Sequence, residues 1–142
     1  MKKFNLIFKY SGYISLIGWI LLIGFPKANF TDQVVIYLSV GLLCFIYSYL
    51  IILSKNATDE KFPKGSFWSF KGVVNLFKNP KSILIGWIHF LAFDLMVGMY
   101  IKNDAINNDI SFWLVIPVLL LTLMLGPLGL LAYLLLTFLI QL

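Results

Sequence analysis

The stretch Trp87-Ile88-His89-Phe90-Leu91-Ala92-Phe93-Asp94 lies inside an apolar segment that runs from about Ser82 to Ile101. It contains the only histidine of the chain, and Asp94 is the only acidic residue within any long apolar run. An ionised carboxylate at the centre of a bilayer costs about 2.5 kcal/mol or more, so an acid kept there is a functional-site hypothesis by default. We therefore expect the rest of the chain to house these two side chains.

The composition is that of a membrane protein. Of 142 residues, 61% are hydrophobic and 12% are charged, whereas a soluble domain carries roughly 25% charged residues. The mean hydropathy is +0.93, and the length allows one domain. All eleven basic residues are lysines beside apolar runs, where they meet anionic lipid headgroups, so the net charge of +5 does not indicate nucleic-acid binding. The single cysteine, Cys44, excludes an intramolecular disulfide.

The hydropathy pattern predicts an all-α integral membrane four-helix bundle in a single domain, residues 1–142. A span needs about 20 apolar residues, which sets four candidates. These are residues 6–25, 34–53, 82–101 and 112–139. Asn79-Pro80 is a start signal for the third span, with asparagine as N-cap and proline at the first helical position. Lys102 to Asp109 is then expected to form a polar loop, with Asp109 or Ser111 capping the last helix.

The long connection between the second and third spans contains a further helical pattern. Phe67, Phe70, Val74 and Phe77 recur at helical spacing, with lysines on another face. This pattern predicts a short interfacial amphipathic helix over residues 66–78. A solvated amphipathic helix that packs on a partner is the alternative.

The last apolar segment, Phe112 to Leu142, is 31 residues long. As one helix it would measure about 45 Å, which exceeds a ~30 Å hydrocarbon core, yet it is too short for two spans. Pro127 removes a backbone donor from the Leu123 carbonyl, so we expect one span with a kink at this proline.

Lysines near the span ends predict the orientation. Nine lie on the side of the N-terminus and the long connection, and two, Lys27 and Lys102, lie on the other side. The positive-inside rule then places both termini in the cytoplasm. The expected location is a multi-pass protein of the plasma or inner membrane.

His89 and Asp94 do not share a face of an ideal helix, because five residues rotate by roughly 140°. Either each faces a different neighbouring helix, or a π-bulge near Ala92 brings them together. A low-dielectric surrounding disfavours the charged forms of both groups, so both could exchange protons near neutral pH in a general acid–base site. The alternative is a structural hydrogen-bond pair between helices.

A metal site is not expected, because one histidine and one carboxylate fall short of the three or four protein ligands that zinc needs. No other cofactor is indicated. Proton-relay transport is a further alternative, but four short spans with one buried acid provide few groups for a transport path.

A set of motifs spreads over most of the chain, from Pro26 to Tyr133. It comprises Trp87-x-His89-x4-Asp94-Leu95, then Asp104, then Gly126-Pro127-x-Gly129-Leu130. With these motifs the chain resembles the small integral membrane proteins of the abscisic-acid-deficient-four type, whose plant members are required to make neoxanthin from violaxanthin. The Trp-x-His and Asp-Leu core is the specific part of the likeness.

The resemblance implies chemistry on a carotenoid or related isoprenoid by an isomerase-type enzyme. Opening an epoxide to an allene needs a base and an acid, and His89 and Asp94 have suitable side chains. The implied substrate groove is lined by aromatic residues, namely Trp87, Phe90, Phe93 and Trp113. The alternative is a non-enzymatic carotenoid-binding, lipid-binding or membrane assembly protein. The expected partner is a membrane lipid or carotenoid, and whether the chain forms a homo-oligomer is left open.

Overall fold

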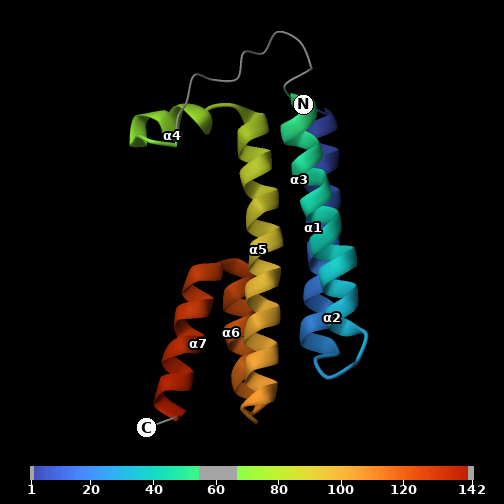
Figure 1. Ribbon diagram of the computed structural model, residues 1–142, viewed down its shortest axis with the longest axis vertical. Helices are drawn as coiled ribbons and strands as arrows, with labels where there is room; N and C mark the ends of the chain where they lie inside the picture. Colours follow the sequence, from blue (N-terminus) through green and yellow to red (C-terminus); the bar gives the residue numbers. More distant parts are fainter. Residues whose placement is uncertain (1, 55–66, 141–142) are drawn as a thin grey trace.

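The computed structural model describes residues 2–54 and 67–140, in which helices are joined by short turns and loops, without a strand. Figure 1 shows a long bundle in which α5 runs through the centre. The helices other than the second span are α1 (Lys2–Gly24), α4 (Phe70–Leu76), α5 (Pro80–Asn107), α6 (Phe112–Met124) and α7 (Gly126–Ile140). The prediction of an all-helical chain is confirmed for the described residues.

The second span is one continuous helical column with a change of pitch. It consists of α2 (Thr31–Gln33), the π-helical segment η1 (Val34–Val40) and α3 (Gly41–Ser54). The sequence predicts no π turn here, since a π-bulge is expected, as one alternative, only near Ala92. Ser39 in η1 is buried, and its hydroxyl lies beside Gly18 of α1.

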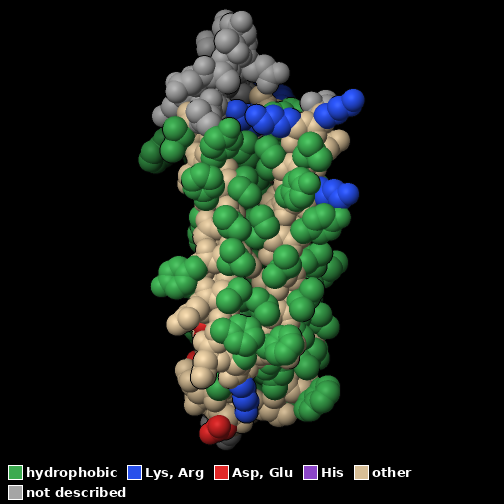
Figure 2. Space-filling view, turned by 90° about the vertical axis from the view of Figure 1, so that its right-hand side faces the viewer, with side chains coloured by type: hydrophobic (Ala, Val, Ile, Leu, Met, Phe, Trp, Pro, Cys, Tyr) green, Lys and Arg blue, Asp and Glu red, His purple; other side chains and the backbone are tan. Residues whose placement is uncertain are grey.

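Three segments within the described ranges are long and apolar enough to cross a membrane: Lys2–Gly24, Thr31–Ile52 and Pro80–Asn107. Each matches one of the first three predicted spans, although each is longer than predicted at one end or both. Figure 2 shows lysines toward the two ends of one face and hydrophobic side chains over the length between them. The length and surface of these helices indicate a membrane protein.

The central helix α5 begins as the sequence predicts. The side chain of Asn79 accepts a hydrogen bond from the Lys81 amide at 2.8 Å, and Pro80 occupies the first turn. Its end differs from the prediction, because the helix continues to Asn107 through most of the expected loop. Lys102 points into the bundle, where it is paired with Asp32, so the polar residues here do not interrupt the helix.

The last apolar segment corrects the sequence-based prediction. It forms two helices, α6 and α7, which pack against each other and against α5, so the single kinked span over 112–139 is wrong. Leu125 leaves the helical conformation, with φ −144° and ψ 74°. Pro127 then stands in the first turn of α7, where its missing N–H costs nothing, so it starts a new helix instead of kinking an old one.

The hairpin also changes where the chain ends. Figure 1 shows its turn about halfway along α5, and both outer ends of the hairpin near the end of α5 that holds Asn107. The N-terminus and the C-terminus therefore lie at opposite ends of the bundle, whereas the sequence predicts both on one side. A four-helix bundle of full spans is not what this arrangement shows.

The predicted amphipathic helix is present in shorter form as α4. The Ser69 hydroxyl caps it by accepting a hydrogen bond from the Gly72 amide at 3.1 Å. Figure 1 shows α4 running sideways from the start of α5. Its position at a membrane interface stays a prediction, and residues 55–66 of the connection, with three lysines used for the orientation, lie outside the described residues.

The core lies where α1, the second span and α6 meet α5. Leu22, Leu43, Ile88, Leu95 and Leu119 are all fully buried there. Trp19 packs over Gly98, whose position leaves no room for a Cβ beside the indole ring. This close packing holds α5 firmly, so the side chains on its remaining faces have defined surroundings.

Candidate functional site: the groove at His89

A groove with a volume of about 680 Å³ lies beside the first half of α5, which is within the size range of small-molecule sites. It is lined by α5 together with residues of α3 and of the α4 region. Its lining residues are Tyr47, Ile51, Phe67, Leu76, Phe77, Ser82, Ile85, Gly86 and His89. Most are apolar, and Tyr47, Ser82 and His89 provide the polar atoms. Such a groove suits a largely hydrocarbon molecule with few oxygen atoms.

His89 is held in the groove by aromatic rings. Its imidazole stacks on Phe93, one turn further along α5, with 4.4 Å between ring centroids. Tyr47 of α3 lies across from it at 6.0 Å. Among the residues that the structure describes, none forms a hydrogen bond to His89, and its side chain is exposed.

Asp94 lies on a different face of α5, against the turn of the α6–α7 hairpin. Its carboxylate is in contact with Gly126, the first residue of α7. Helix α5 is α-helical from Pro80 to Asn107, so no π-bulge rotates Asp94 toward His89. The two residues are separated by about 7.5 Å along the axis and about 140° around it. The structure does not bring them together in one pocket.

Phe90 and Phe93 occupy the surface of α5 between these two residues. At 100° per residue they fall within the arc from His89 to Asp94. Their exposed fractions are 56% and 57%, because no described helix covers this part of α5. An extended apolar molecule could lie against both rings with one end in the groove.

The two predicted tryptophans lie elsewhere. Trp87 packs against Phe8 of α1, with 5.3 Å between ring centroids. Trp113 stands in the first turn of α6 with 82% of its surface exposed. Since α6 starts near the far end of α5, Trp113 is not beside the groove that contains His89.

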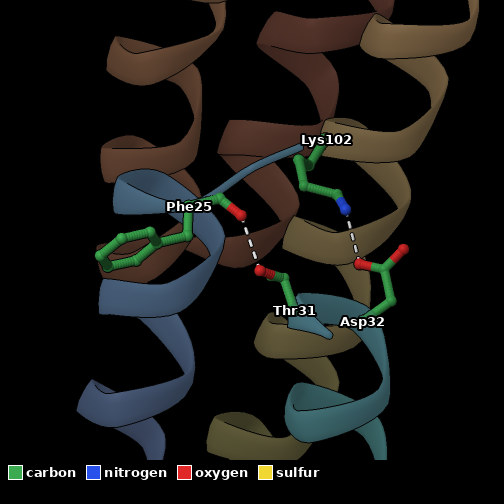
Figure 3. A network of polar contacts seen from close by, with 4 residues as sticks. All are labelled: Phe25, Thr31, Asp32 and Lys102. Atoms are coloured by element: carbon green, nitrogen blue, oxygen red, sulfur yellow. Dashed lines mark hydrogen bonds and ion pairs between the residues drawn. The ribbon is translucent and has the colours of Figure 1, made fainter. Parts of the chain in front are cut away.

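Polar pairs that the sequence reasoning did not anticipate lie at the far end of α5. The Lys102 ammonium is 2.5 Å from an Asp32 carboxylate oxygen, and the neighbouring Thr31 hydroxyl donates to the Phe25 carbonyl at 2.6 Å. Figure 3 shows the first contact joining α5 to α2 and the second joining α2 to Phe25, which follows α1. They tie three segments together rather than line the groove.

A second pair connects α5 to α7. The Tyr133 hydroxyl donates to the Asp104 carboxylate at 2.6 Å, and Tyr100 packs edge-on to the Tyr133 ring. The sequence contained a signal for this pair, because Asp104 belongs to the quoted motifs and Tyr133 is the last residue of the region that they cover. The pair was missed because Asp104 was predicted to lie in a loop. No group of three potential metal ligands occurs among the described residues.

These contacts bring together motifs that lie far apart in the chain. Asp94 meets Gly126, and Asp104 meets Tyr133, so the motif on α5 and the motif on α7 form one packed unit. The chain matches the family described as ABA DEFICIENT 4-like over residues 6–133. It belongs to this family. The resemblance expected from the sequence is thereby confirmed, and membership suggests a membrane protein linked to the carotenoid and abscisic acid pathway. Comparisons with curated proteins and with solved structures find no match.

Proposed function

We propose that this protein binds an oxygenated carotenoid or a related isoprenoid, and that His89 exchanges a proton with the bound molecule. The observation that carries the proposal is the position of the only histidine in an apolar groove, with no protein partner for its ring nitrogens among the described residues. The His89 side chain is exposed on α5, and the hydrocarbon region of a membrane offers it no hydrogen-bond partner. An unpartnered imidazole beside an apolar groove is therefore suited to a ligand oxygen.

The surroundings of the groove support an isoprenoid. Tyr47 and Ser82 offer hydroxyl groups to an oxygenated end group. Phe90 and Phe93 extend an aromatic surface away from the groove, along which a polyene could lie. The family's link to the carotenoid and abscisic acid pathway supports this substrate class.

The separation of His89 from Asp94 changes the proposed chemistry. An epoxide isomerisation moves a proton within the substrate, from carbon to the former epoxide oxygen, without net gain or loss. One imidazole could take that proton and return it, so the reaction does not require Asp94 as a second acid at the same site.

Binding without chemistry is the second candidate function. It is favoured by the same separation, since no acid–base pair is assembled around the groove. Both candidates use the same ligand site, and they differ in whether the bound molecule is changed.

The test is expression of the full chain in a carotenoid-producing host, followed by purification and chromatography of the extracted pigment. We expect wild-type protein to co-purify with an oxygenated carotenoid that is enriched or altered relative to the host membrane. His89→Phe keeps a ring to stack on Phe93 but removes both nitrogens, so it should lose the alteration. Trp113→Phe, far from the groove, is the matched control and should behave as wild type.

The outcomes separate the candidates. Altered pigment with wild type and unaltered pigment with His89→Phe would support proton transfer by His89. Bound but unaltered pigment in both would support a binding protein. Wild-type protein that carries no pigment above that of an unrelated membrane protein, in a host whose pigments stay unchanged, would refute both.

A further inference from the structure

Two glycines of α7 are in close contact with two different neighbours. A Cβ at Gly126 would collide with the Asp94 carboxylate of α5, and a Cβ at Gly129 would collide with the backbone of Thr122 in α6. In one continuous helix, Thr122 and Gly129 would be about 10.5 Å apart along the axis and would not touch. The close contact of Gly129 with Thr122 is therefore explained by the hairpin and not by one continuous helix.

Asp94 meets the hairpin at its turn, beside the first residue of α7. Leu125 lies between the helices, and Pro127 has no N–H to offer to the Leu123 carbonyl. Gly126 begins α7, and the start of a helix carries a partial positive charge that favours a nearby carboxylate. Irregular backbone at membrane depth is tolerated where protein or a polar cavity covers it. The Asp94 side chain supplies part of that cover.

We propose that Asp94 is a positioning residue, which seats the turn of the C-terminal segment on α5 and so holds residues 112–140 as a hairpin instead of one long helix. The apolar sequence of this segment suits both forms, so a specific contact at the turn has to select between them. The consequence is topological. The hairpin returns the C-terminus to the end of the bundle where α6 began, opposite the N-terminus. This inference does not depend on which molecule the His89 groove binds.

The experiment uses the full chain with a tag at each terminus, in membrane vesicles of known orientation. Protease accessibility of each tag reports its side, and thermal unfolding of the purified protein reports stability. The variants are Gly126→Ala, Asp94→Ala, their combination and Asp94→Asn. Gly12→Ala is the matched control, because a Cβ at Gly12 would meet nothing within 4 Å.

In wild-type protein we expect the two tags on opposite sides. Gly126→Ala should lower the unfolding midpoint by about 5 °C, as overpacking does, and move a fraction of the C-terminal tags to the side of the N-terminus. Asp94→Ala should also shift part of the C-terminal tags. The combined variant should be no worse than Asp94→Ala alone, because the shortened side chain leaves room for the new Cβ. Asp94→Asn keeps the side-chain volume and should keep the tags on opposite sides.

Three results would overturn the proposal: wild-type tags on the same side, a Gly126→Ala variant that matches Gly12→Ala, or additive losses in the combined variant. If Gly126→Ala fails to accumulate, recovery of accumulation by Asp94→Ala in the same chain supports the contact, and lack of recovery contradicts it. His89→Phe should leave the tag positions and the midpoint unchanged. Failure of the ligand proposal can therefore be told apart from failure of this one.

Discussion

The two ends of α5 surround their polar side chains differently. Toward its C-terminus, Lys102 pairs with Asp32 and Asp104 accepts a hydrogen bond from Tyr133, so each charged group has a partner on another segment. Toward its N-terminus, His89 has aromatic rings beside it and a groove in front of it. Burying a charge is costly unless it is paired. The paired groups therefore belong to the fold, whereas His89 is exposed and has no hydrogen-bond partner among the described residues.

Asp94 falls between these two cases. It lies near the middle of α5 and touches the hairpin turn, yet none of the described residues forms a hydrogen bond to it. From residue type alone, Asp94 would form an acid–base pair with His89. From its contacts, Asp94 resembles the structural residues at the far end of α5.

The largest effect in this comparison is expected from breaking the Lys102–Asp32 pair. Asp32→Ala leaves the Lys102 ammonium, whose side chain is 3% exposed, without its counter-charge. Losing one partner of a fully buried ion pair lowers the free energy of unfolding by about 3–5 kcal/mol. Asp32 is 44% exposed and water screens the pair, so we expect the free energy of unfolding to fall by about 2 kcal/mol. Thermal unfolding in detergent measures it.

The combined variant Asp32→Ala, Lys102→Met is the control for this pair. Removing both charges should recover most of the lost stability, because no unpaired charge stays buried. A single variant that unfolds as the wild type does would show that the ion pair does not hold the far end of α5 together.

The first three spans were predictable because their signals are local. Runs of about 20 apolar residues locate the helices, and Asn79-Pro80 locates the start of α5 to the residue. The position of His89 on one face and Asp94 on another also followed from the helical period alone. What the period could not say is which neighbour each face meets.

The C-terminal hairpin was missed because its determinants are tertiary. A proline inside a long apolar run predicts a kink when only the run is considered. Here the turn depends on close contacts of Gly126 with Asp94 and of Gly129 with Thr122, which lie on other helices. The Lys102–Asp32 pair was missed for the same reason, since 70 residues separate its members in the chain.

A smaller effect is expected from Tyr133→Phe. This variant removes the hydroxyl that donates to Asp104 at 2.6 Å and leaves the carboxylate without that donor. A hydrogen bond to a charged group contributes about 1.5 kcal/mol or somewhat more to stability, so we expect the free energy of unfolding to fall by that amount. Tyr37→Phe is the matched control, because Tyr37 is 79% exposed, and it should unfold with the wild type. Equal midpoints for the two variants would contradict a structural role for the Asp104–Tyr133 contact.

The smallest effect on stability is expected from His89→Phe. The new ring can stack on Phe93 as the imidazole does, and no hydrogen bond to a described residue is lost. The free energy of unfolding should therefore change by less than about 0.5 kcal/mol, as for a substitution away from structural contacts. The same thermal unfolding measurement, made without added pigment, compares it directly with Tyr133→Phe.

A loss of stability as large as that of Tyr133→Phe would show that His89 supports the fold as Asp104 does, and the contrast between the two ends of α5 would disappear. An unchanged midpoint, together with altered pigment handling, would show that the chain keeps its histidine for the groove and not for packing.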